Sequence, residues 1–360
     1  MTDTEVLPDP RETAGITNHP LLAAAETDDA ALQAALRQAL AAGDDAGLRA
    51  VLCAQPPVHA QRVARALAAA VDAGGEGIGL RFFAIPLVIV AGARNRGSVP
   101  GVLSDVGRIS ALLEQHGAIG VTRNFGLGNA LCSAEALDAV SPSALWRAAV
   151  DPSQRAPLDV LQPEPVAVAG GREQVHLRFI TGAGITPQHL PSFLESASNI
   201  GSWGMPLTKE LARQLAQPGL EILPMPRPPQ PLLLAAQSGR RAQLEAALNL
   251  FLGNTLRRFR MAIGDPEAVL SAHRLDGGAG ELRLSLSTPL DDSLFEGFAW
   301  PLQPQDEVAE VTRLFQSLLA ECRVPAVTVL QPVLPDRMAG GSAFVAGRML
   351  EGLNKAPARH

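Results

Sequence analysis

The fold follows from the apolar stretch Phe82-Phe83-Ala84-Ile85-Pro86-Leu87-Val88-Ile89-Val90, which precedes a glycine-punctuated loop at 91–98. An uninterrupted apolar run of this length, with β-branched residues and bounded by glycine, is typical of a strand buried on both faces. Such strands lie in the middle of sheets that helices cover on both sides. We therefore predict that 82–90 is the central strand of the core.

The segments that follow predict an α/β domain over 77–222. Helical periodicity over 102–116 gives one apolar stripe, made of Leu103, Val106, Ile109 and Leu113. A strand, a loop and a helix in this order are typical of the opening of an α/β unit. Residues 173–180 alternate apolar and polar side chains and predict a second strand with one polar face.

Two segments precede this domain. Residues 1–25 mix proline, acidic residues and threonine without periodicity, so we expect them to be disordered. Residues 26–76 contain three short amphipathic stretches, separated by Gly43 and by Pro56-Pro57. This pattern predicts an N-terminal layer of three helices.

A proline-rich segment at 223–231 marks the predicted domain boundary. Its five prolines are too many for an interior strand, so we interpret it as an inter-domain linker. The order helix, hairpin, helix and strand over 232–334 predicts an α+β sandwich of ferredoxin-like character, which a strand near Glu221 to Leu223 would complete. Residues 335–360 predict a flexible tail. The fold class is thus α/β with a mixed α+β part.

Composition limits the classes of function. The 360 residues are 47% hydrophobic and 18% charged, enough for a large core, and the net charge of -6 argues against a dedicated nucleic-acid binder. The three cysteines are far apart and form no CxxC pair, as expected in a reducing cytoplasm. No apolar run approaches the ~18 residues of a membrane span, and the first residues differ from a signal peptide.

The loop after the central strand is the first candidate site. Gly92 and Gly97 have the spacing of a phosphate loop, but Ser98 stands where that loop needs lysine. Arg94 and Arg96 are suited to a smaller anion or a carboxylate, because guanidinium groups bind planar oxyanions. The alternative is that both arginines are solvated loop residues.

His176 and Arg178 are the second candidate, because residues two apart on a strand point to the same side. They would serve as an anion-binding pair, with His176 as an acid or base. The alternative is an edge strand with its polar face in water.

The third candidate is a cluster of arginines on the long helix, Arg257, Arg258 and Arg260. The cluster would contact an acidic protein partner, or else form the solvated face of the helix. The histidines lack metal-ligand spacing, so we expect neither a metal nor a cofactor. Cys132 has small apolar neighbours and is interpreted as a buried structural thiol.

The order of strand 87–90, a helix with Asp105, strand 175–180 with Thr181-Gly182-Ala183-Gly184, and then Leu232 to Gly239 resembles caspase-type peptidases. In that family a Ser-Gly-His-Gly loop supplies the histidine and an Asp-Ala-Cys segment followed by Ser-Gly supplies the nucleophile. Ala183 and Ala236 occupy the two catalytic positions here. The resemblance therefore implies an inactive scaffold.

These observations lead to one main expectation and two alternatives. We expect a cytoplasmic, non-catalytic protein that binds or assembles with another protein, because no titratable residues converge in the sequence. The first alternative is an enzyme that acts on a small anionic substrate through Arg94, Arg96 and His176. The second is the inactive caspase-like scaffold.

Overall fold

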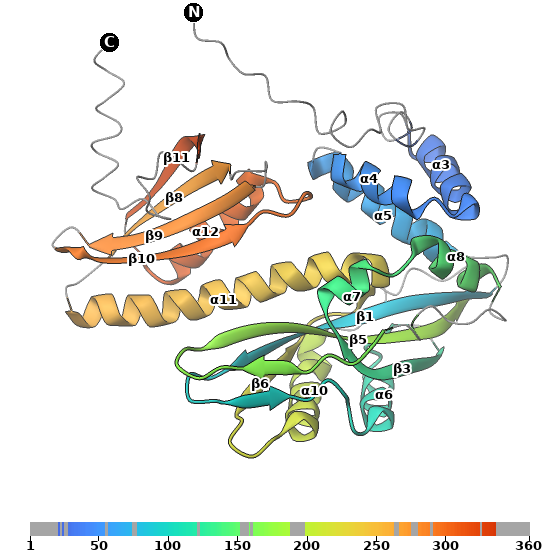
Figure 1. Cartoon of the computed structure of the whole chain (residues 1–360), viewed down its shortest axis with the longest axis horizontal. Coiled ribbons are helices and arrows are strands. Elements are labelled where there is room, and N and C mark those ends of the chain that lie inside the picture. The colour runs from blue at the N-terminus through green and yellow to red at the C-terminus, as the bar shows by residue number, and fades with distance from the viewer. Residues whose placement is uncertain are drawn as a thin grey trace, which may run out of the picture. The chain divides into compact units, whose positions relative to one another are not determined.

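The computed structural model describes residues 21, 24, 28–54, 57–73, 78–120, 123–151, 158, 161–187, 199–262, 266–274, 280–288, 291–324 and 326–335. The chain is a mixture of helices and strands and divides into two compact units, 1–243 and 244–360 (Figure 1). The predicted tails at 1–25 and 335–360 fall almost entirely outside the described residues. None of the described helices combines the length and the apolar character needed to cross a bilayer.

The sheet of the first unit is built around strand β1 (Ile78–Ala91), as the apolar stretch predicts. On one side β1 pairs with β5 (Gln174–Pro187), which in turn pairs with β3 (Arg123–Cys132). On the other side β1 pairs with β6 (Ile222–Pro226) and β7 (Gln230–Pro231). All these pairs are antiparallel.

Both faces of β1 are buried, because alternate side chains enter two separate hydrophobic clusters. Phe82 and Ala84 belong to one cluster, and Phe83, Ile85 and Leu87 to the other. Full burial of a large apolar side chain contributes roughly 1.5–3 kcal/mol, so the strand anchors the unit.

Helices cover the sheet on both sides (Figure 1). The cluster around Phe83 receives side chains from α6 (Val106–Gln115) and α10 (Ile200–Leu215). The cluster around Phe82 receives them from a larger set of helices: α3 (Asp29–Ala42), α4 (Asp45–Ala54), α5 (Pro57–Ala73), α7 (Ala134–Asp138), α8 (Pro142–Val150) and the first residues of α11 (Leu232–Ala262).

The helices of the N-terminal layer form where the sequence predicts them. Asp28 caps α3 by accepting a hydrogen bond from the Ala31 amide over 2.7 Å. The helix ends at Gly43, whose φ of 76° is accessible to glycine without strain. The predicted stripe Leu32, Leu36 and Leu40 is fully buried.

The interpretation of 223–231 as a linker is wrong, because this segment forms an edge of the sheet. β6 pairs with the C-terminal part of β1, and β7 pairs with Phe83 and Ala84. Between them, the Arg227 amide donates to the carbonyl of Pro86 over 2.8 Å. An edge strand tolerates proline because one row of its amides needs no partner.

A small two-stranded sheet, β2 (Gly97–Val99) with β4 (Val166–Val168), extends the loop after β1. Elsewhere in the first unit, the buried carboxylate of Glu210 ties α10 to α6. It lies 2.5 Å from Arg213 and 3.1 Å from Arg108, and Gln214 donates to it over 2.8 Å. The hydrogen bonds from Arg213 are the main reason that the pKa of Glu210 falls to about 2.

The second unit contains one sheet and two helices. The long helix α11 (Leu232–Ala262) enters it from the first unit, and the boundary at 243 lies inside this helix. The remaining elements follow in chain order: β8 (Glu267–Arg274), β9 (Gly280–Thr288), β10 (Asp291–Pro301), α12 (Val308–Glu321) and β11 (Ala326–Pro335).

The strand order of this sheet is β10-β9-β8-β11, with β11 parallel to β8 and the other pairs antiparallel. The predicted hairpin and the predicted helix with Val311 and Phe315 on its buried face are both present. However, the strand expected near Glu221 for a ferredoxin-like module is β6, which pairs in the other sheet. The unit instead has a three-stranded meander followed by a helix and a parallel strand.

Candidate functional site

The loop after β1 is fixed by Asn95, which lies between the two arginines predicted to bind an anion. The Asn95 side chain is buried, accepts a hydrogen bond from the Glu221 amide over 3.1 Å and donates to the Glu221 carbonyl. The Gly171 amide donates to the carbonyl of Ala93 over 2.8 Å. Arg94 and Arg96 are exposed on this loop.

His176 and Arg178 line one small cavity of about 180 Å³ together with Arg240 and Gln243. The Arg178 guanidinium donates to the carbonyls of Glu164 and Leu177 over 3.0 and 2.8 Å, and to that of Pro165 over 3.3 Å. These bonds hold Arg178 against the backbone. Neither Arg94 nor Arg96 lines this cavity.

The other polar groups around the cavity also make hydrogen bonds or ion pairs within the protein. His176 Nε2 lies 3.1 Å from Gln174 Oε1, and burial and the charge of Arg178 lower its pKa. Arg240 lies 2.5 Å from Asp138, and Gln243 donates to the carbonyl of Val175. The cavity therefore presents polar side chains that already have protein partners.

At His176 and Arg178, among the described strands, β5 pairs with β1 alone, as an edge strand would. β5 lies between β1 and β3, but its pairing with β3 ends at Phe179. His176 and Arg178 lie beyond that point, and the Arg178 side chain donates there to the carbonyls of Glu164 and Pro165.

The three clustered arginines of α11 have different surroundings. Arg260 donates to the carbonyl of Cys322 over 2.6 Å and so binds the C-terminal end of α12. Arg258 lies 2.7 Å from Glu296 on β10. Arg257 is exposed. Two of the three arginines thus stabilise the second unit itself.

A buried polar constellation on β8 and β9 was missed by the sequence analysis. Ser271 Oγ lies 2.8 Å from His273 Nε2, and Arg283 NH1 lies 3.5 Å from His273 Nδ1. Arg283 also binds Glu281 over 2.5 Å. The signal was present in the sequence, because these residues alternate with the apolar residues of the hairpin.

The His273 ring in this group does not carry its hydrogen on the nitrogen that would let it activate Ser271 as a nucleophile. Arginine is a donor only, so Nδ1 of His273 accepts and Nε2 carries the hydrogen toward Ser271. A general base for serine needs the opposite tautomer, with Nε2 free to accept. We interpret the group as a structural hydrogen-bond network.

Cys132 is buried, in agreement with its interpretation as a structural thiol. Burial is the main cause that raises its pKa to about 11, and the nearby Glu164 carboxylate adds to this. Such a thiol is almost entirely protonated at neutral pH and is a poor nucleophile. The two positions that the caspase resemblance singles out, Ala183 and Ala236, lie on β5 and α11.

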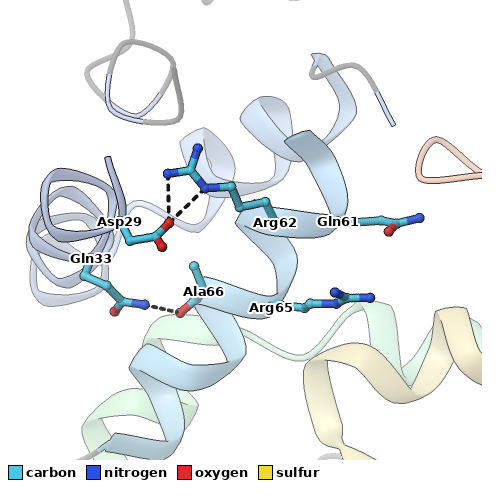
Figure 2. A pocket seen from close by; sticks show the side chains of 6 residues that line it. All are labelled: Asp29, Gln33, Gln61, Arg62, Arg65 and Ala66. Atoms are coloured by element: carbon cyan, nitrogen blue, oxygen red, sulfur yellow. Dashed lines mark hydrogen bonds and ion pairs between the residues drawn. The ribbon is translucent and has the colours of Figure 1, made fainter. Parts of the chain in front are cut away.

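Residues of α3 and α5 line an open groove, and we name it the helical-layer groove. It has a volume of about 520 Å³ and is lined by Asp29, Gln33, Gln61, Arg62, Arg65 and Ala66. Figure 2 shows that Arg62 and Gln33 bridge the two helices, whereas Gln61 and Arg65 point away from α3.

The bridging contacts orient the donors of this groove. Arg62 binds the carboxylate of Asp29 over 2.8 Å, and Gln33 donates to the carbonyl of Ala66 over 3.3 Å. Arg65 is exposed. The groove therefore has two guanidinium groups and one carboxylate, an arrangement that suits an anionic ligand.

Among the described residues, no group of three histidine, cysteine or acidic side chains is arranged to hold a metal ion. Comparison with protein-family models, curated proteins and solved structures gives no match.

Proposed function

We propose that the chain is a non-catalytic, cytoplasmic protein that binds an acidic segment of another protein in the helical-layer groove. The observation that carries the proposal is the pair Arg62 and Arg65 on one open groove. Three free cysteines in the described residues suit a reducing compartment.

The contacts of the groove support recognition of carboxylates. Arg62 is held in place by Asp29, whose side chain is 88% exposed and can exchange with a carboxylate of the ligand. Arg65 is one helical turn further along α5 and adds a second cation. The side-chain oxygen of Gln33, whose amide nitrogen donates to Ala66, adds an acceptor for the backbone of a bound segment.

The polar groups around His176 and His273 already have partners within the protein, and this also favours binding over catalysis. The polar groups around His176 are held by the protein, and the His273 tautomer does not suit a general base. The first alternative, an enzyme for small anions, needs Arg94 and His176 at a common site, and Arg94 is not part of the His176 cavity.

Selection of a random peptide library on the purified chain at low salt tests the proposal. We expect the recovered peptides to be enriched in aspartate and glutamate. The affinity of a recovered peptide should fall about five- to tenfold in Arg65→Glu, since an exposed ion pair is worth up to about 1 kcal/mol and the reversal adds repulsion.

Arg37→Glu is the matched control, because Arg37 is an exposed arginine on α3 that does not line the groove. Its affinity for the peptide should stay within about twofold of the unmodified chain. Equal losses in both variants, or recovered peptides without acidic enrichment, would contradict the proposal.

A further inference from the structure

The helical-layer groove is close in sequence to an acidic segment at the start of the chain. Leu21 is buried in the hydrophobic cluster that also contains Leu32 of α3 and Leu67 of α5. Asp29, eight residues after Leu21, begins α3 and lines the groove. Eight residues span at most about 29 Å, so residues 1–20 are attached to the first unit within that distance of the groove.

The charge of residues 1–20 is opposite to that of the donors in the groove. Four carboxylates against one guanidinium give the side chains of this segment a net charge of -3: Asp3, Glu5, Asp9, Glu12 and Arg11. The groove contributes the guanidinium groups of Arg62 and Arg65, and Asp29 is the acid in its lining. The segment therefore has the chemistry that the groove is proposed to recognise.

The spacing of the acids also matches the spacing of the guanidinium groups. Arg62 and Arg65 are three residues apart on α5, so their Cβ atoms are separated by about 5–6 Å. In an extended segment, side chains two residues apart point to the same side and are separated by about 6–7 Å. Asp3 and Glu5 have this separation in the sequence, so one extended segment can present a carboxylate to each arginine.

We propose that residues 1–12 bind in the helical-layer groove when no partner is present and compete there with the acidic segment of the partner protein. The inference rests on the proposed function, because it requires that the groove binds carboxylates. A segment of the same chain competes at an effective concentration on the order of 1 mM. The groove is therefore autoinhibited, and a partner binds only when its own contacts are stronger than those of the N-terminal segment.

The amide resonances of residues 3–12 in ¹⁵N–¹H spectra of the full chain test the contact directly, without any peptide. Arg65→Glu should shift these resonances, because repulsion releases the segment. Arg37→Glu makes the same charge change at an exposed position of α3 outside the groove and should leave them in place. In ~1 M salt, where the Debye length is about 3 Å, the resonances of the parent should move toward those of Arg65→Glu. The remaining resonances of each variant report whether the chain is folded.

Affinity for an acidic peptide recovered from the library provides a second measurement. The full chain with its N-terminal carboxylates neutralised should bind this peptide about fivefold more tightly than the parent at low salt, because the internal competitor is lost. The substitutions are Asp3→Asn, Glu5→Gln, Asp9→Asn and Glu12→Gln. The matched control exchanges the two acids at the same positions and should bind within about twofold of the parent, because it keeps every charge. Its substitutions are Asp3→Glu, Glu5→Asp, Asp9→Glu and Glu12→Asp.

Two results would overturn the inference. One is that Arg65→Glu and Arg37→Glu leave the resonances of residues 3–12 equally unchanged, and the other is that the neutralised chain and the parent bind the peptide equally. Both results leave the proposed function intact, because a peptide that depends on Arg65 still binds. Failure of the proposed function is recognised separately, from equal losses of peptide affinity in Arg65→Glu and Arg37→Glu.

Discussion

The side chain of Asn95 and the backbone of Glu221 form a two-point hydrogen-bond pair between segments 126 residues apart. This pair joins the loop after β1 to the residue that precedes β6. It holds in place the loop whose glycine spacing is like that of a phosphate site.

Asn95→Ala should lower the free energy of unfolding by about 2 kcal/mol, because two hydrogen bonds of about 1 kcal/mol are lost and the Glu221 groups lose their partner. Urea unfolding followed by circular dichroism measures the change. Ser98→Ala, at an exposed position of the same loop, is the control and should change the value by less than ~0.5 kcal/mol.

Arg260→Ala should destabilise the second unit by about 1 kcal/mol, because the carbonyls at the end of α12 lose a charged donor. Arg257→Ala removes the exposed neighbour and should have almost no effect on thermal unfolding. Equal stability of the two variants would contradict the structural role of Arg260 and favour the original interpretation of the cluster as a partner-binding surface.

Gly239 and Gly253 lie on the same helix, α11, and should respond in opposite directions to alanine. A Cβ at Gly239 would lie 2.5 Å from the ring of Phe179, so Gly239→Ala should cost about 1–3 kcal/mol. Nothing lies within 4 Å of a Cβ at Gly253, so Gly253→Ala should stabilise by about 0.5–1 kcal/mol. The midpoints of thermal unfolding report both changes.

Glu210 should make stability depend on pH. Its pKa is about 2 in the folded chain and 4.5 ordinarily, so its stabilisation is complete above pH 4.5 and is lost as the pH falls toward 2. In Glu210→Gln the decrease in the free energy of unfolding between pH 5 and pH 3 should be smaller than in the parent. A decrease of the same size in both proteins would show that Glu210 is not the group responsible.

The elements that the sequence predicts well are those with a local pattern. The continuous apolar run of β1 identified the centre of the sheet, and the 3.6-residue stripe identified α3 and α12. The neighbours of β1 in the sheet, and their antiparallel direction, were not predictable from such local patterns, because β5 and β6 come from distant parts of the chain.

The prolines of 223–231 show why composition alone misled the prediction of a linker. Pro224 and Pro226 are two residues apart, so their nitrogens face the same side of β6. On an edge strand that side needs no donor. The period of two was the signal of a strand, and the number of prolines concealed it.

The candidate sites were also predictable only in part, because a local pattern in the sequence does not show contacts between distant segments. Alternation placed His176 and Arg178 on one side of a strand, and both line one cavity. The carbonyls of Glu164 and Pro165 that hold Arg178 come from a separate segment, as does Asp29 opposite Arg62. Such long-range pairs leave no periodic trace in the sequence.

The antiparallel pairing of β1 with β7 has a consequence for folding during synthesis on the ribosome. The last partner of β1 is Pro231, about 140 residues after the strand ends at Ala91. At about 5–20 residues per second, the nascent apolar strand waits roughly 7–28 s before both of its edges can be covered. During translation the apolar strand is therefore a segment that a ribosome-associated chaperone would protect.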